Sequence, residues 1–98
     1  MALFIEVIDI QGECPIYKVG DQLILEGAEI TGKICIHALS ALTSLLVPIR
    51  QGIPPKCFGI GNDKEGFLQC PDPGPPLTEG GTVTFRLQFK KSPNPSSE

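Results

Sequence analysis

Residues 82–89, TVTFRLQF, carry the clearest structural pattern in this sequence. Apolar and polar side chains alternate strictly along them, with Val83, Phe85, Leu87 and Phe89 set against Thr82, Thr84, Arg86 and Gln88. Because successive side chains of a strand point to opposite faces, this period of two predicts a strand with one buried and one solvated face. Strands of that kind are typical of antiparallel sheets.

Residues 2–10, ALFIEVIDI, predict a second strand that is apolar on both faces. Leu3, Ile5 and Val7 point to one face, and the other face carries Phe4, Ile8 and Ile10. A strand that is apolar on both sides usually lies in the centre of its sheet or is covered by a partner chain. We therefore expect self-association or a protein partner.

The region 33–47 predicts the one helix of the chain. Its apolar residues recur at the spacing i, i+3, i+4 and i+7, which places one side of the helix against a core. Thr31 is the predicted N-cap, and Pro48 is expected to stop the helix. His37 falls opposite the leucine face, so we interpret it as a surface histidine. The predicted apolar face consists of Cys35, Ala38, Leu39, Leu42, Leu45 and Leu46.

The remaining segments predict shorter elements. Residues 22–26 follow a Gly-Asp turn signal and indicate a short strand, whereas 27–32 indicate a loop. The glycine- and proline-rich stretch at 50–64 is irregular, and a hairpin running from 57 to 70 is a possible interpretation of its second half. The polar residues 92–98 predict a disordered tail.

These elements predict a small α+β fold: a small antiparallel sheet of four to five strands with one helix packed across it. Residues 1–91 would form a single domain. The chain has 98 residues and a net charge of −3, so it offers no basic patch for nucleic acid. We find neither a signal-peptide pattern nor an apolar run long enough for a membrane span. We therefore expect a soluble, cytoplasmic protein without a nucleic-acid or membrane partner.

The four cysteines are the main chemical feature. Cys14 and Cys70 each precede a proline at a predicted strand end, and Cys35 falls in the first predicted turn of the helix. If both strand ends lie beside the helix start, three thiols meet. No Cys-x-x-Cys pair is present, although zinc and iron–sulfur sites usually take ligands in such pairs. Three interpretations stay open: core packing, a metal or cluster site formed by Cys14, Cys35 and Cys70, and redox or nucleophilic thiol chemistry.

The order and spacing of several short motifs resemble those of a family of short, uncharacterised bacterial and archaeal proteins. The motifs are Cys14-Pro15, Gly20-Asp21, Cys35, Gly52 and Cys70-Pro71-Asp72. The similarity extends over about residues 4–89. It implies an independently folded small domain, and it implies no substrate, cofactor or catalytic residue. Cys57 lies outside the pattern.

Two functional hypotheses follow. The first is a non-catalytic binding or accessory module, because the chain has one histidine and no convergent set of acid and base groups. Neither a Gly-x-Ser-x-Gly elbow nor a His-Glu-x-x-His motif is present. The alternative is a thiol-dependent metal-binding or redox protein that uses Cys14, Cys35 and Cys70. The sequence identifies no cofactor.

Overall fold

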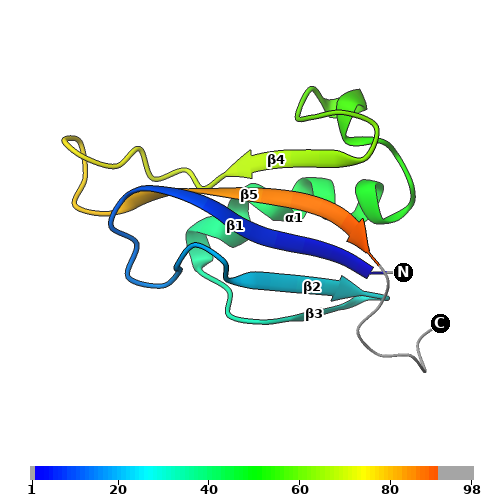
Figure 1. Cartoon of the computed structure of the whole chain (residues 1–98), viewed down its shortest axis with the longest axis horizontal. Helices are drawn as coiled ribbons and strands as arrows, with labels where there is room; N and C mark the ends of the chain where they lie inside the picture. Colours follow the sequence, from blue (N-terminus) through cyan, green and yellow to red (C-terminus); the bar gives the residue numbers. More distant parts are fainter. Residues whose placement is uncertain (1, 91–98) are drawn as a thin grey trace.

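The computed structural model describes residues 2–90, so the tail predicted at 92–98 lies outside the described part. The predicted α+β fold is confirmed: five strands form one antiparallel sheet, and a single α-helix packs on it (Figure 1). In chain order the elements are β1 (Ala2–Gly12), β2 (Gln22–Glu26), β3 (Glu29–Thr31), α1 (Ile36–Arg50), the 3₁₀ helix η1 (Pro55–Phe58), β4 (Glu65–Gln69) and β5 (Gly81–Lys90).

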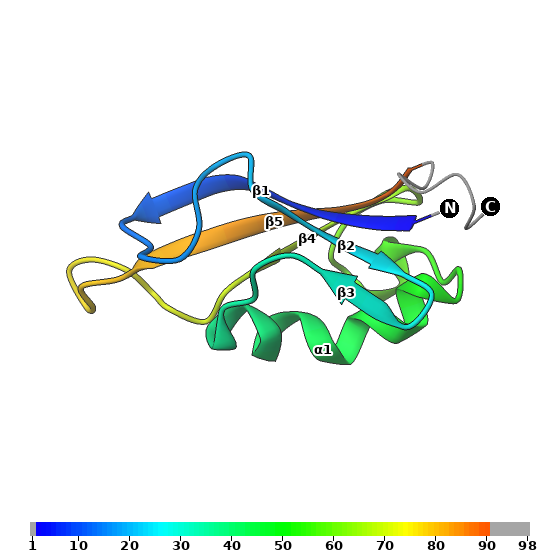
Figure 2. The ribbon, with the colours of Figure 1, turned by 90° about the horizontal axis from the view of Figure 1, so that it is seen from below.

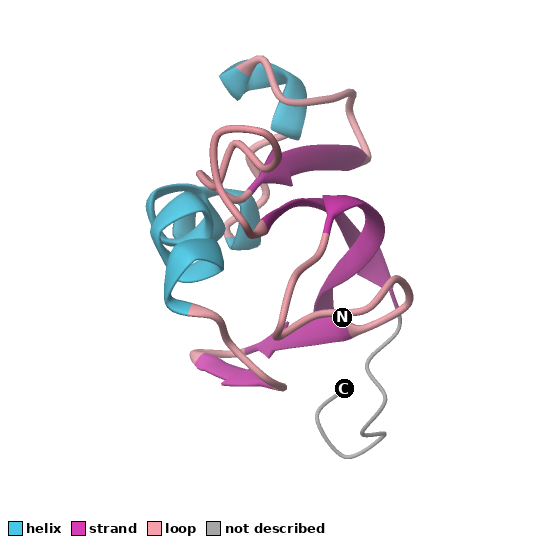
Figure 3. Ribbon diagram, turned by 90° about the vertical axis from the view of Figure 1, so that its left-hand side faces the viewer, coloured by secondary structure: helices cyan, strands magenta, loops and turns pink. Residues whose placement is uncertain are grey.

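The sheet has the order β3-β2-β1-β5-β4, and every neighbouring pair is antiparallel. β1 is therefore the central strand, as its two apolar faces predict. It pairs with β5 along its whole length, from Ala2↔Lys90 to Gly12↔Gly81. Helix α1 covers one face of the sheet and, among the described residues, the other face is left open (Figure 2, Figure 3).

A bulge in β1 changes which of its side chains reach the core. The register against β5 shifts between Val7 and Asp9, so Ile10 is paired with the buried Val83. An extra residue in one strand reverses the inside–outside alternation beyond it. Ile10 therefore packs against the core, and the prediction that it shares a face with Phe4 and Ile8 is wrong.

The core lies between the sheet and α1. Leu3, Ile5 and Val7 of β1 face the helix, together with the alternating apolar residues of β5. These side chains have lost nearly all contact with water, and such burial is the main source of stability in a domain of this size. The helix contributes Ala38, Leu42, Leu46 and Ile49.

Helix α1 begins and ends later than predicted. Thr31 is not the N-cap, because it pairs with Ile24 in β3. The helix instead follows Cys35, whose extended backbone precedes the first turn and whose carbonyl accepts the amide of Leu39 at 2.9 Å. Pro48 does not stop the helix: a proline removes one hydrogen bond, and the burial of Ile49 one residue later favours a further half-turn.

Two shorter segments also differ from their predicted structures. Residues 27–32 are not a loop throughout, because Glu29–Thr31 pairs with β2 as an edge strand. The hairpin predicted at 57–70 forms only around its turn, where Gly61 and Gly66 make an isolated antiparallel bridge and the amide of Phe67 donates to the carbonyl of Ile60 at 2.7 Å. Its first arm begins as the 3₁₀ helix η1, and β4 has its main pairing with β5. A proline at the first position of η1 has its φ preset for a helical turn and has no amide to contribute to a sheet.

None of the helices in residues 2–90 is long and apolar enough to cross a lipid bilayer.

Candidate functional site

The structure brings Cys14, Cys35 and Cys70 to one cavity of ≈ 200 Å³. They come from three segments: the chain after β1, the residue before α1, and the residue after β4. All three are free thiols, and so is Cys57, which is exposed in η1 and does not line the cavity. The cysteine cavity is lined by Cys14, Pro15, Ile16, Tyr17, Cys35, His37, Ala38, Cys70, Asp72, Gly80, Gly81 and Val83.

Cys70 is the buried member of the set. The amide of Val83 donates to its sulfur at 3.2 Å, and the thiol donates to the carbonyl of Gly81 at 3.5 Å. Its own amide donates to the carbonyl of Val83 at 3.0 Å. These bonds continue the β4–β5 pairing beyond Gln69, so the sheet itself fixes the position of this sulfur.

Cys14 and Cys35 are both hydrogen-bonded to Tyr17, Cys14 to its backbone amide and Cys35 to its hydroxyl. The amide of Tyr17 donates to the sulfur of Cys14 at 3.3 Å, which closes a tight turn after β1. The Tyr17 hydroxyl donates to the carbonyl of Lys33 at 2.8 Å and accepts the amide of Cys35 at 3.0 Å. One tyrosine thus ties the turn after β1 to the chain that leads into α1.

Tyr17 is a site residue that the sequence analysis missed. It is 4% exposed, and its ring meets Phe85 of β5 edge to face at 5.6 Å between centroids. Burial raises the pKa of the Tyr17 hydroxyl above its usual 10.0. The hydrogen bond from the Cys35 amide lowers this pKa by less, and the Cys35 and Cys14 thiols and Asp21 add to the rise. Tyr17 is the one tyrosine of the chain and lies two residues after the Cys14-Pro15 motif. This position beside the motif is the feature of the sequence that could have identified Tyr17 as a site residue.

Asp72 and His37 add polar groups to the cavity lining. The hydroxyl of Thr78 and the amide of Gly74 both donate to Asp72 Oδ1, the amide at 2.9 Å. These two bonds hold the pKa of Asp72 below its usual 3.8, and the His37 side chain lowers it further. The carboxylate is therefore ionised at neutral pH. His37 is exposed, as its place on the helix predicts.

The two carboxylate oxygens of Asp72 differ in their hydrogen bonding. Throughout the described range, no donor bonds to Oδ2. This oxygen lies against Gly80, where an added Cβ would overlap it. Gly80 therefore admits the carboxylate to the wall of the cavity.

The three sulfurs are not arranged as a metal centre. Within residues 2–90, no group of three or more His, Cys, Asp or Glu side chains is positioned to hold a metal ion. The sequence predicts that Cys14, Cys35 and Cys70 lie close together. In the structure they line the same cavity, but they are not placed as ligands of one metal ion.

Comparison of the chain with protein-family models, with curated proteins and with solved structures finds no match.

Proposed function

We propose that the protein is a non-catalytic binding module and that the cysteine cavity holds its ligand. The observation that carries this proposal is the convergence of three thiols, an imidazole and a carboxylate from distant segments on one cavity of ≈ 200 Å³. An apolar cavity of about 150 Å³ is large enough to bind benzene. A ligand of similar size would therefore fit among Ile16, Ala38 and Val83.

The charge of the lining favours a ligand with an amine. Asp72 is ionised, and its Oδ2 has no donor among the described residues. The Tyr17 hydroxyl is already both donor and acceptor to the backbone. A small molecule with an apolar body and one ammonium group would place that group against Asp72 and its body against the thiols and alkyl side chains.

The hydrogen bonds around the cavity favour binding over catalysis. A nucleophilic cysteine is activated by a base within hydrogen-bond reach. In the part of the chain that the structure describes, the His37 imidazole bonds to no thiol, and the sulfurs of Cys14 and Cys70 accept backbone amides. The thiols therefore serve as soft, polarisable walls.

Benzylamine and benzyl alcohol make a matched pair of probes for this proposal. We expect benzylamine to shift the amide resonances of Cys14, Cys35 and Cys70 in ¹⁵N-labelled protein at lower concentration than benzyl alcohol does. Asp72→Asn keeps the acceptor for Gly74 and Thr78 and removes the charge, so this preference should disappear. Glu29→Gln, which removes an exposed carboxylate of β3 that lines neither this cavity nor the one at the other end of α1, is the control. Equal responses to both probes in the wild type would contradict the proposed ligand class.

A second candidate is a thiol-dependent activity at Cys14, Cys35 and Cys70, either redox chemistry or the binding of a metal ion that would have to draw the three sulfurs together. The observation in its favour is that Cys14 and Cys35 both bond to Tyr17, one through its sulfur and the other through its amide. Elemental analysis of anaerobically purified protein, with a thiol titration, tests it. Bound metal that is lost in Cys35→Ser but retained in Cys57→Ser would support it, and metal-free protein with three unreactive thiols would exclude it.

We also propose a cellular location for the protein and a pattern of residue conservation among its relatives. Four free cysteines suit a reducing compartment, which supports a cytoplasmic location. The motif order that resembles the family of short bacterial and archaeal proteins includes Cys14, Cys35, Cys70 and Asp72, all of which line the cavity. If those residues are kept for a ligand, relatives will retain them more often than Cys57.

Self-association is proposed through the open face of the sheet. Phe4 and Ile24 are neighbours on β1 and β2, and both are half-buried on the face away from α1. Glu6 and Arg86 form an ion pair on the same face, so a two-fold contact would have to accommodate charge as well as apolar surface. Sedimentation over a hundredfold concentration range tests the proposal, with Phe4→Lys as the disrupting variant. A constant monomer mass would overturn it.

A further inference from the structure

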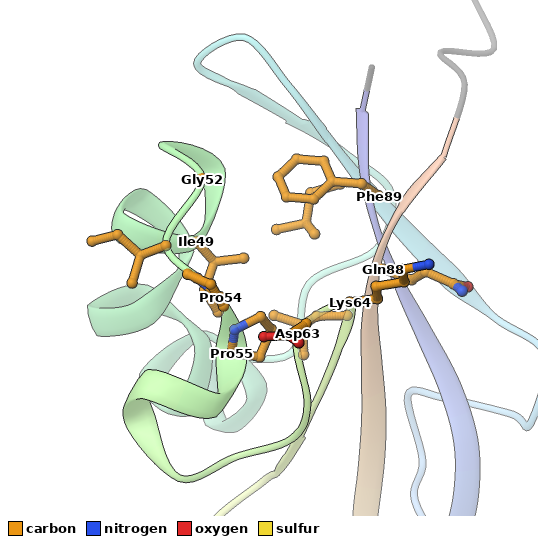
Figure 4. A pocket seen from close by; sticks show the side chains of 11 residues that line it. Ile49, Gly52, Pro54, Pro55, Asp63, Lys64, Gln88 and Phe89 are labelled. Atoms are coloured by element: carbon orange, nitrogen blue, oxygen red, sulfur yellow. The ribbon is translucent and has the colours of Figure 1, made fainter.

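A second cavity, of ≈ 380 Å³, lies at the C-terminal end of α1, about a helix length from the cysteines. It is bounded by the end of the helix, the chain that leads into η1, the turn before β4 and the last residues of β5 (Figure 4). Its lining residues are Leu3, Ile49, Gly52, Ile53, Pro54, Pro55, Asp63, Lys64, Leu87, Gln88 and Phe89. Its volume falls within the usual range of small-molecule sites, about 300–1,000 Å³.

Most of the wall of this cavity is apolar. Leu3, Ile49 and Leu87 belong to the core and form its floor. Ile53 and Phe89 stay 42% and 37% exposed at its rim. Figure 4 shows the Phe89 ring extending from β5 toward the side on which Ile49 and Gly52 lie. A ligand with an apolar body would remove the exposed parts of both rim side chains from water.

Among the described residues, the charged groups at the rim leave one positive charge without an ion-pair partner. Asp63 is paired with Lys56, whose Nζ lies 2.8 Å from its Oδ1. Lys64 has no ion-pair partner among residues 2–90. The turn that carries both residues is fixed, because the amides of Lys64 and Glu65 donate to Asn62 Oδ1 at 2.8 Å each. The backbone of Lys64 is therefore held beside the cavity before any ligand binds.

We propose that this cavity is a binding site for a small carboxylate with an apolar body, such as an aryl-alkanoate. The body would lie on Ile49, Leu87 and Phe89, and the carboxylate would pair with Lys64. An ammonium at the same place would meet Lys64 as a like charge, and a neutral head group would gain no ion pair. The site is separate from the cysteine cavity and shares no lining residue with it.

Three probes that differ in their head group test the proposal: 4-phenylbutanoate, 4-phenylbutan-1-ol and 4-phenylbutylamine. In ¹⁵N-labelled protein, we expect saturable shifts of the amides of Gly52, Ile53, Lys64 and Phe89, with the carboxylate binding tightest. Lys64→Met keeps most of the side-chain length and removes the charge. Because the lysine is exposed, it should weaken the carboxylate about two- to fivefold and leave the alcohol unchanged.

Two further variants keep the result interpretable. Lys18→Met removes an exposed lysine near the other end of the molecule and should change no affinity. Ile53→Asp places a negative charge at the rim, on an exposed residue whose change should not unfold the protein, and should abolish carboxylate binding. The proposal is overturned if the three probes bind equally, if Lys64→Met and Lys18→Met behave alike, or if the shifts do not saturate. Benzylamine binding at the cysteine cavity should be unaffected by Lys64→Met, so either site can fail without the other.

Discussion

At the scale of single residues, Tyr17 does most to assemble the cysteine cavity. Its hydroxyl joins two backbone groups of the 33–35 segment, and its amide bonds to the sulfur of Cys14. The ring itself packs on Phe85 in the core. A phenylalanine could make the ring contact, so the hydroxyl is the part that carries the connection between the turn and the helix start.

Removing that hydroxyl should destabilise the fold. Tyr17→Phe leaves the Lys33 carbonyl and the Cys35 amide without their partner, which costs about 1–2 kcal/mol of unfolding free energy for partly buried groups. Urea denaturation measures the loss. Val19→Ala, at an exposed neighbour, should change the free energy by less than about 0.5 kcal/mol. Equal stability of wild type and Tyr17→Phe would show that water replaces the hydroxyl.

The raised pKa of Tyr17 predicts that the stability of the fold changes at alkaline pH. Because the pKa of Tyr17 is raised in the folded state, the unfolded chain loses the proton first, near pH 10.0. The stabilisation of the folded state by the protonated Tyr17 hydroxyl is complete below pH 10.0. This stabilisation is lost as the pH rises through the pKa of Tyr17 in the folded state. Denaturation between about pH 8 and 11 should therefore show wild type losing its advantage over Tyr17→Phe. A constant difference across this range would contradict the prediction.

Asp72 predicts the opposite behaviour in acid. Its pKa is held below 3.8 first by the Thr78 hydroxyl, so Thr78→Val should raise that pKa toward 3.8. The stabilisation from the ionised carboxylate is complete above pH 3.8 and is lost as the pH falls through the lowered pKa. The carboxyl ¹³C shift of Asp72, followed by NMR against pH, measures the pKa of Asp72 in the wild type and in Thr78→Val. Thr84→Val, which does not contact Asp72, should leave the titration unchanged.

At the scale of elements, helix α1 illustrates how tertiary packing outweighs a local stop signal. Pro48 removes one backbone bond near the end of the helix, yet the chain stays helical to Arg50. The amide of Gln51 still reaches the carbonyl of Val47 at 3.1 Å, and Ile49 is buried against the sheet. The proline removes the hydrogen bond to the carbonyl of Ser44, and because Ser44 is exposed, water can bond to that carbonyl instead. The burial of Ile49 therefore stabilises the last turn by more than the missing hydrogen bond destabilises it.

Pro48→Ala should therefore stabilise the protein. The alanine restores an amide for the Ser44 carbonyl and removes the steric conflict of the ring, while the unfolded chain regains some freedom. We expect a net gain of about 1 kcal/mol in unfolding free energy, measured with urea. Val47→Ala, at a neighbouring side chain that is 56% exposed, should change it little. A clear loss in Pro48→Ala would mean that the proline ring itself is needed for packing.

At the scale of the whole molecule, the long β1–β5 pairing places Ala2 beside Lys90 at one end and builds the cysteine cavity at the other. The last pair, Gly12↔Gly81, lies where the chain leaves β1 toward Cys14. A Cβ on Gly81 would lie 2.9 Å from the amide nitrogen of Glu13. Backbone therefore lies directly on backbone at this end of the sheet, and a glycine is required there.

Gly81→Ala should separate these segments and open the cavity. We expect a loss of about 1–3 kcal/mol in unfolding free energy, because the new methyl group meets rigid backbone. Cys70, whose thiol bonds to the Gly81 carbonyl, should react faster with an aromatic disulfide reagent. The measurement is made in a Cys57→Ser background, which removes the exposed thiol. Thr84→Ala is the control, and unchanged Cys70 reactivity in Gly81→Ala would contradict the close approach.

The sequence by itself determined the two long strands, the helix and their assembly into an α+β sheet, because hydrophobic periodicity is a local property of the chain. It also placed His37 on the surface, and it limited β1 to two positions, the centre of the sheet or a contact with a partner chain, of which the structure shows the first. Only the tertiary structure decided that Ile10 belongs to the core, that Thr31 lies in a strand, and that Tyr17, Asp72 and three cysteines share a cavity. Those outcomes depend on which backbone segments pair across the sheet, and pairing between residues as far apart as Gly12 and Gly81 leaves no periodic signal in either segment.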